Sequence, residues 1–153
     1  MRRLKIDRLQ RERVDQVFPL IQLLKPHLSW EDWHARALAH MSGDSPRTGF
    51  LAAEDESQVV LGLLQFSVEE DLDCGRMLRV QNVVALDFFE RLQNDIAIRL
   101  IRAINDLAID QDCRAIEIQM PRSDAARRNM ALVTLLEAHG FRQNQTEFRK
   151  RFA

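Results

Sequence analysis

Residues 77–104 read MLRVQNVVALDFFERLQNDIAIRLIRAI, and this stretch decides the fold. Its first part, residues 77–86, is rich in valine and predicts a long β-strand. Its second part places apolar residues four apart on one face of a helix, at Leu92, Ile96, Leu100 and Ile104. The stretch therefore predicts a long strand and then the strongest helix of the chain.

The segments before this stretch predict one strand, two helices and two more strands. Residues 4–6 form a short strand candidate, and apolar residues at helical spacing run through residues 11–25. Pro19 lies inside that run, so we expect the helix to kink or restart there. A second helix is expected over residues 29–41, capped by its first residue, a serine. Two strands joined by a turn follow, at residues 49–53 and 59–66.

The segments after the stretch predict a strand, a helix and a final pair of strands. Residues 115–120 alternate apolar and polar side chains, as a half-buried strand does. A last helix is expected from Ser123 to His139, with Gly140 as the left-handed residue that ends it. Residues 141–152 are expected to form one or two strands, the basic tail Arg149, Lys150 and Arg151 being the solvated face of an edge strand.

Length and composition restrict the class of protein. A chain of 153 residues with 46% hydrophobic residues fits one domain, residues 1–153, with a proper core. A formal net charge of −1 argues against nucleic acid and acidic membranes as partners. We expect a cytoplasmic protein, because neither a signal peptide nor a membrane-spanning run is present. Cys74 and Cys113 lack metal-ligand spacing and are expected to be free thiols, and no metal site is expected.

The predicted order is β-α-α-β-β-β-α-β-α-β(-β), an α/β fold with a mixed sheet, and it resembles the GNAT superfamily of N-acetyltransferases. Local matches support the resemblance over nearly the whole chain. Val60-Leu61-Gly62 is similar to the V-x-G of the family's third strand. Glu137-Ala138-His139-Gly140-Phe141 is similar to the E-x-x-G-F that follows its last helix. The resemblance implies an acetyl-CoA-dependent N-acyltransferase that acts on an amine of a small molecule or peptide.

The resemblance also implies where acetyl-CoA would bind. In this family the fourth and fifth strands are parallel and splay apart, and the pantetheine arm pairs with the exposed backbone. This places the splayed strand at residues 81–86, with the backbone of Val83, Val84 and Ala85 against the arm. The pyrophosphate would bind at the start of the following helix. The implied contacts there are Arg91, Gln93, Asn94, Asp95, Ile96 and Ala97, with Asn129 from the last helix.

The expected phosphate loop differs from the family pattern, because no glycine occurs between Arg76 and His139. In one register Asp95 and Ala97 stand where the family has glycine or alanine, and in another Asn94 does. Asn and Asp can begin a helix. The carboxylate of Asp95, however, would repel pyrophosphate unless it points to solvent, where Arg91, or Arg99 as well, would supply positive charge.

The implied catalytic positions also differ from the family. Amides, including Asn82, stand where family members carry a carboxylate on the fourth strand, and an amide cannot act as a base. Leu136 stands near the position of the tyrosine that protonates the leaving thiolate. His34 is an alternative general base, and a surface histidine is its simpler interpretation. The acidic run Glu69, Glu70, Asp71 and Asp73 either attracts an amine or forms a solvated hairpin.

Two functions from different classes therefore remain open. The first is an N-acyltransferase with a divergent phosphate loop. The second is a catalytically inactive module of the same fold that binds a ligand or a partner and can form a homodimer through its end strands. Losing glycines, carboxylates and the tyrosine together favours the second, whereas the order of the predicted elements favours the first.

Overall fold

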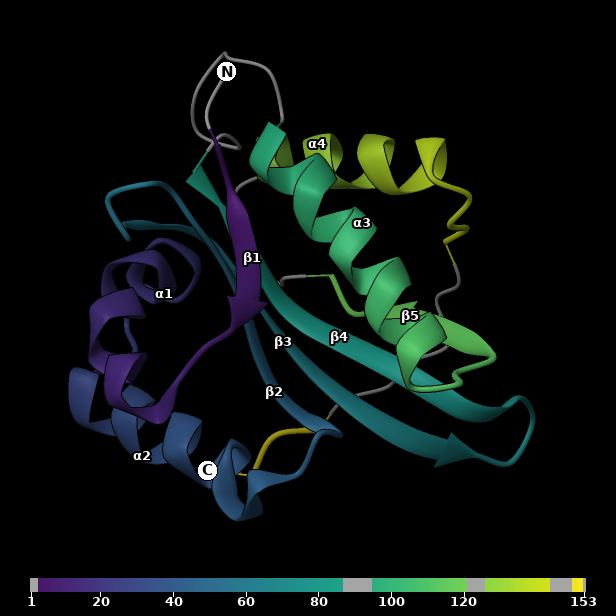
Figure 1. Cartoon of the computed structure of the whole chain (residues 1–153), viewed down its shortest axis with the longest axis horizontal. Helices are drawn as coiled ribbons and strands as arrows, with labels where there is room; N and C mark the ends of the chain where they lie inside the picture. The colour runs from purple at the N-terminus through teal and green to yellow at the C-terminus, as the bar shows by residue number, and fades with distance from the viewer. Residues whose placement is uncertain (1–2, 87–94, 121–125, 144–149, 153) are drawn as a thin grey trace.

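The computed structural model describes residues 3–86, 95–120, 126–143 and 150–152. Its centre is a five-stranded sheet with helices on both faces (Figure 1). The strands lie in the order β1-β2-β3-β4-β5, which is also their order along the chain. Their bounds are β1 Lys5–Arg8, β2 Thr48–Glu54, β3 Val60–Asp71, β4 Gly75–Ala85 and β5 Ala115–Ile118. This is the mixed α/β architecture that the sequence predicts.

The first four strands are antiparallel to their neighbours, and β5 alone runs parallel to its neighbour, β4. The parallel pair needs a crossover, which α3 (Asp95–Asp110) provides. The turn between β2 and β3 falls where the sequence predicts it. There the carboxylate of Asp55 accepts hydrogen bonds from the backbone N–H groups of Ser57 (2.8 Å) and Val59 (3.0 Å).

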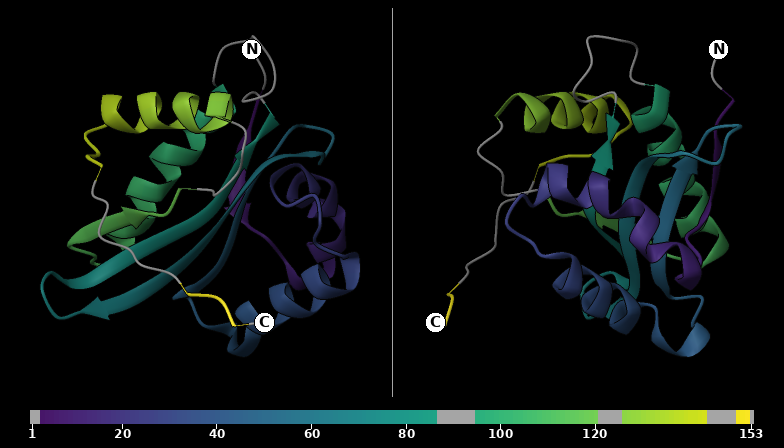
Figure 2. Two further views of the ribbon diagram at one scale, coloured as in Figure 1. Left: turned by 180° about the vertical axis from the view of Figure 1, so that it is seen from behind. Right: turned by 90° about the vertical axis from the view of Figure 1, so that its left-hand side faces the viewer.

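Two hydrophobic layers bury the two faces of the sheet. The 3₁₀ helix η1 (Arg11–Val17), α1 (Phe18–Leu24) and α2 (Trp30–His40) pack on one face; α3 and α4 (Ala126–Ala138) pack on the other (Figure 2). We call these the α1/α2 face and the α3 face. Fully buried residues of α3 repeat at helical spacing, as predicted, at Ile96, Leu100 and Ile104.

Pro19 explains why the first predicted helix divides into two. A continuous α-helix over residues 11–25 would need an N–H at position 19 to bond the carbonyl of Asp15, and proline has none. The Asp15 carbonyl instead accepts the N–H of Phe18, three residues on, as in a 3₁₀ helix. A new α-helix begins at Phe18 with Pro19 in its first turn. The predicted restart is confirmed, but the first half is a 3₁₀ helix.

Two other helix ends match their sequence signals. The hydroxyl of Ser29 accepts the N–H of Asp32 at 3.1 Å and so caps α2. Gly140 follows α4 with a φ of +88°, the left-handed conformation that ends a helix. The short helix η2 (Ser42–Asp44) occupies the predicted loop after α2. Ser123, the expected cap of the last helix, lies outside the described residues.

The predicted C-terminal strands fall mainly on residues outside the description and stay a prediction there. Neither residues 141–143 nor residues 150–152 are in a strand, and residues 144–149 lie outside the description. Lys150 and Arg151 are exposed, and no described strand includes them.

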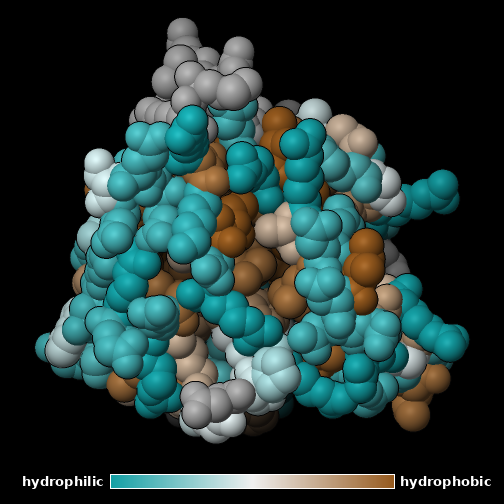
Figure 3. Space-filling model, in the orientation of Figure 1, coloured by the Kyte–Doolittle hydropathy of each residue, from teal (hydrophilic) through white to brown (hydrophobic). Residues whose placement is uncertain are grey.

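Hydrophilic residues dominate the surface seen in the orientation of Figure 1 (Figure 3). No helix in the described ranges is long and apolar enough to cross a membrane. Cys74 and Cys113 are free, as expected. A side-chain hydrogen bond to Asp71 raises the pKa of the Cys74 thiol, and burial raises that of Cys113, so neither is an activated nucleophile.

Gly62 of β3 allows α3 to lie close against the sheet. A Cβ atom at this position would lie 2.7 Å from Cγ2 of Ile96 and 3.0 Å from Cδ1 of Leu100. Both side chains are almost fully buried and have little room to move. The glycine of the V-x-G motif is thus a packing requirement.

We expect Gly62→Ala to lower the free energy of unfolding by about 1–3 kcal/mol, because the added methyl overpacks the α3–sheet contact. Chemical denaturation measures this change. Gly49→Ala is the matched control with a milder contact, since its Cβ would lie 3.3 Å from the end of the Phe66 ring and 3.9 Å from NH1 of Arg8. Equal stability of the Gly62→Ala variant and the unmodified protein would contradict the packing argument.

Candidate functional site

The parallel pairing of β4 with β5 stops halfway along β4. Register pairs run from Met77 with Ala115 to Val80 with Ile118, and the N–H of Gln119 donates to the carbonyl of Val80 at 2.8 Å. β4 continues beyond this point to Ala85 and remains paired with β3. Among the described residues, nothing pairs with the other edge of residues 81–85. This edge, here called the β4 opening, lies at the stretch where the family resemblance places it.

A β-bulge bends β4 at the start of the opening. Leu63 pairs with Val84 and Gln65 with Gln81, so one residue of β3 stands opposite two of β4. Asn82, in the bulge, has a φ of +54°, a left-handed conformation that asparagine adopts more readily than most residues. Bulges bend a strand and increase its twist, and this bend lies where β4 and β5 separate.

A hydrogen-bonded chain connects the bulge to the end of α2. The Asn82 amide donates to Oε1 of Gln65 at 2.8 Å, and Nε2 of Gln65 lies 3.4 Å from Nδ1 of His40. Nε2 of His40 lies 2.9 Å from the carbonyl oxygen of Phe66 and 3.2 Å from that of Gly49. Two acceptors at Nε2 place the proton on that nitrogen and leave Nδ1 to accept from Gln65. His40 therefore orients Gln65, which in turn holds Asn82.

The residues predicted to contact pantetheine have buried side chains. Val83, Val84 and Ala85 are 3%, 1% and 0% exposed. Val83 and Ala85 pack into the core of the α3 face, and Val84 into that of the α1/α2 face. Only their backbone groups remain for a ligand along the open edge.

The start of α3 is described from Asp95 onward. Asp95 is exposed, whereas the side chains of Ile96 and Ala97 are buried in the core. Arg91, Gln93 and Asn94 lie outside the described residues. Asn129 belongs to α4, but its side chain lies outside the description. The guanidinium of Arg99, an alternative source of charge, donates to the carbonyl of Leu4 at 2.7 Å and so anchors α3 to the start of β1.

The predicted catalytic candidates Asn82 and His34 do not share a site. Nδ1 of His34 lies 2.8 Å from the carboxylate of Asp15 in η1, and its ring stacks near Trp30 with centroids 5.0 Å apart. None of the contacts described for His34 reaches β4. Leu136, near which the family resemblance places the tyrosine, is 7% exposed and packs into the core of the α3 face.

The sequence analysis missed two charged residues beside the opening. Arg79 of β4 lies between Glu69 of β3 and Glu117 of β5, with its NH1 3.1 Å from Glu69 Oε2 and its Nε 3.6 Å from Glu117 Oε1. Of these three residues, the sequence analysis named only Glu69, as part of an acidic run. The alternation of polar residues in the two strands is visible in the sequence, but the strand register that brings Arg79 and Glu117 together is not.

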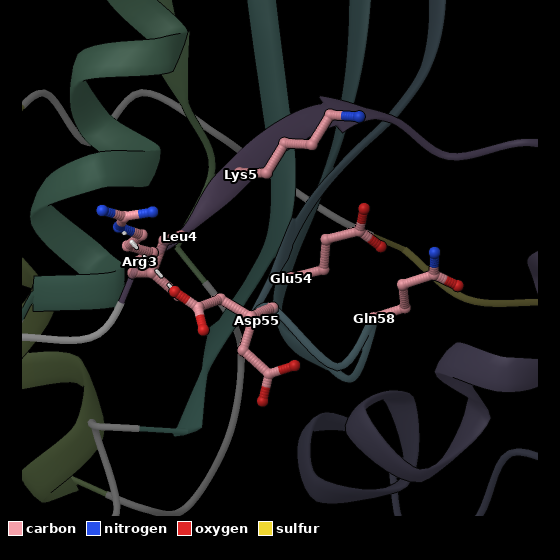
Figure 4. Close-up of a pocket in the computed structure, with 7 residues that line it drawn as sticks. Arg3, Leu4, Lys5, Glu54, Asp55 and Gln58 are labelled. Carbon is pink, nitrogen blue, oxygen red and sulfur yellow. Dashed lines mark ion pairs between the residues drawn. The ribbon is translucent and has the colours of Figure 1, made fainter.

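A pocket lies at the same end of the sheet as the open end of β4, but on the side of β1 and β2. This pocket of about 280 Å³ is lined by residues of β1 and of the β2–β3 turn, among them Arg3, Lys5, Glu54 and Asp55 (Figure 4). Its charges are already matched, since Arg3 pairs with Glu56 at 3.8 Å and Glu54 with Arg13 at 2.7 Å. Among the described residues, no group of three or more His, Cys, Asp or Glu side chains could hold a metal ion.

Comparison with known proteins identifies the fold. No family model matches the chain, and no curated protein matches its sequence. Among solved structures, the aminoglycoside N-acetyltransferase AAC(6')-Iy, in complex with CoA, superposes with a TM-score of 0.78 at 17% identity, over 99% of this chain and 96% of that one. A glucosamine-6-phosphate N-acetyltransferase from Arabidopsis thaliana gives 0.70 at 16% identity, over 99% of each chain.

A protein described as a transcriptional regulator from Bacillus halodurans C-125 is equally similar, with a TM-score of 0.78 at 16% identity over 98% of this chain and 100% of that one. The chain therefore has the GNAT fold, as the sequence analysis predicts. At these identities the likeness concerns the fold, and function has to be argued from the site.

We expect Asn82→Ala to be less stable than Asn82→Gly. Both variants lose the hydrogen bond to Gln65, but alanine also pays about 1–2 kcal/mol for a left-handed backbone, which glycine does not. Chemical denaturation of the two variants measures the difference. If alanine at this position were as stable as glycine, the bulge conformation would not depend on residue 82.

Proposed function

We propose that this protein is an acyl-CoA-dependent N-acyltransferase, which transfers an acetyl group from acetyl-CoA to an amine of a small molecule or peptide. The observation that carries the proposal is the β4 opening, where β4 continues for five residues past its last register pair with β5. The structures with the same fold support it, since one of them is an N-acetyltransferase in complex with CoA.

The backbone of the opening suits a pantetheine arm. An open strand edge presents N–H and C=O groups that an extended, amide-containing chain can pair with, as an added strand would. The side chains of Val83, Val84 and Ala85 point into the two cores. Binding through the backbone would leave this packing undisturbed.

The start of α3 is the proposed phosphate site. The first N–H groups of a helix have no partner within it, and the helix dipole favours an anion there. The side chains of Ile96 and Ala97 are buried, so these residues would contribute only backbone N–H groups. We propose Arg91, Gln93, Asn94 and Asn129 as the remaining contacts. Asp95 is exposed, and its carboxylate opposes an incoming phosphate by like charge.

The chain's own groups would act mainly by positioning. Acetyl-CoA supplies an acetyl group activated as a thioester. The bulge at Asn82, fixed by Gln65 and His40, sets the direction of the β4 edge beside which the amine must approach. Holding two reactants in an attack geometry alone accelerates such a reaction substantially. His34 is assigned no step, because its described contacts are with Asp15 and Trp30.

A catalytically inactive module with the same ligand site is the second candidate. The observation that favours it is the burial of Leu136, near which the resemblance places the family's tyrosine, because a leucine side chain cannot protonate the thiolate. Such a module would bind acetyl-CoA without releasing CoA thiol in the presence of amines. Turnover with any amine separates the two functions.

Acetyl-CoA is expected to raise the melting temperature, because a ligand that binds only the folded state adds RT ln(1 + [L]/Kd) to its stability. Differential scanning fluorimetry at millimolar acetyl-CoA measures the shift. Adenosine 3′,5′-bisphosphate, which lacks the pantetheine arm, is the control and is expected to give a smaller shift. No shift with acetyl-CoA would overturn the proposed function, and equal shifts would exclude the β4 edge as the binding surface.

Asp95→Asn is expected to bind acetyl-CoA about two- to fivefold more tightly, since removing a like charge near a helix N-terminus is worth about 0.3–1 kcal/mol. Isothermal calorimetry at low and high salt measures the gain, which added salt should diminish. Asp106→Asn is the matched control, because Asp106 is also exposed on α3 but lies 11 residues further along it, about 16 Å away. Unchanged or weaker binding by Asp95→Asn would place the phosphates elsewhere.

A further inference from the structure

A strip of polar side chains lies on the α1/α2 face of the sheet, beyond the end of α2. The helices bury Leu63 of β3 and Val84 of β4 on this face. Toward the β3–β4 hairpin, no further described residue of β3, β4 or β5 belongs to the core cluster of this face. Alternation along β3 and the register across β4 and β5 bring six polar residues onto it, namely Gln65, Ser67, Glu69, Arg79, Gln81 and Glu117. All six are partly or fully exposed.

Arg79 joins the two carboxylates of this strip, but it holds them unequally. Glu69 is engaged through both oxygens, with Oε2 3.1 Å from Arg79 NH1 and Oε1 accepting the hydroxyl of Ser67 at 3.2 Å. Glu117 has a single described contact, from Oε1 to Arg79 Nε at 3.6 Å, which is too long for a hydrogen bond. Its side chain is 55% exposed. A cation could therefore bind Glu117 without breaking a hydrogen bond.

Glu117 stands at the narrow end of the β4 opening. It lies opposite Arg79 in the parallel register, and the next pair, Val80 with Ile118, is the last before the strands separate. Gln81, on the same face as Arg79, is the first residue of the open edge. Glu117 is thus level with a residue of β4 that lies two strand residues, about 6.6 Å of rise, before the start of the open edge at Gln81.

We propose that Glu117 binds the ammonium group of the acceptor and removes its proton, with Arg79 and Glu69 as positioning residues. The assignment rests on the proposed acyltransferase function and supplies the base that β4 itself lacks. Glu69, Arg79 and Glu117 together carry a formal charge of −1, which selects a cationic acceptor over a neutral or anionic one.

The ammonium gives one proton to the Glu117 carboxylate, which later releases it to solvent. The freed nitrogen lone pair forms the C–N bond to the acetyl carbon while the C–S bond breaks. The second proton lost from nitrogen passes to the departing thiolate, giving the amide, CoA thiol and one released proton.

The test compares Glu117→Gln with Glu70→Gln. Glu70 is the matched control, because it is an ion-paired carboxylate next to Glu69 on β3, 3.3 Å from Arg76, but alternation turns it to the opposite face. Binding of acetyl-CoA is measured first by calorimetry and is expected to be the same in both variants and in the unmodified protein. Four amines are then screened by CoA thiol release, namely kanamycin, glucosamine 6-phosphate, spermidine and a peptide with a free N-terminus.

The amine that is acetylated fastest is carried into two measurements. Its dissociation constant, measured by calorimetry without acetyl-CoA, is expected to rise about tenfold in Glu117→Gln through loss of a charge-assisted hydrogen bond. The kcat/KM of this variant is expected to fall about 100-fold or more at about pH 7. The deficit should shrink as pH approaches about 10, where a primary amine is increasingly unprotonated in solution and no longer needs a base.

Glu117→Asp, which keeps a carboxylate, is expected to recover part of the activity, and Glu70→Gln to match the unmodified protein. Equal loss in Glu117→Gln and Glu70→Gln, or a deficit independent of pH, would overturn the assignment of Glu117. Acetyl-CoA binding without acetylation of any of the four amines would also overturn it. Failure of the unmodified protein to bind acetyl-CoA would instead overturn the proposed function, and the assignment with it.

Discussion

The molecule depends on the bend of β4 at its bulge. β4 pairs with β3 along nearly its whole length, yet it pairs with β5 through only four register positions. The bulge places two residues of β4 opposite one of β3, and Asn82 takes the left-handed conformation that this requires. One side chain of β3, Gln65, connects that residue to His40 at the end of α2. The helical layer on one face thereby fixes the shape of the open edge.

Close packing on the other face places α3 relative to the same edge. Gly62 admits Ile96 and Leu100 against β3, and a Cβ atom there would also lie 3.3 Å from the carbonyl oxygen of Val84. One glycine therefore governs the distance between the first turns of α3 and the open part of β4. The two surfaces that a CoA molecule would need, a strand edge and a helix start, are held together by core packing.

Local patterns in the sequence predicted the helices and strands well. They did not predict the contacts between segments that are distant in the sequence. The apolar repeat of α3, the capping serine at Ser29 and the restart at Pro19 each depend on residues within a few positions, and the structure contains all three. The predicted C-terminal strands stay a prediction, since residues 144–149 lie outside the described ranges. The ion pairs of Arg79 were missed because they depend on the register of three strands, which alternation along one strand does not identify.

A crystal structure with bound CoA tests the central claim most directly. The account predicts that the pantetheine arm lies along β4 between Val80 and Ala85 and hydrogen-bonds to its backbone, with the phosphates at the start of α3 and the thiol directed toward Glu117. The bulge at Asn82 should be unchanged. CoA bound elsewhere on the molecule, or β5 paired with β4 along its full length, would contradict the account.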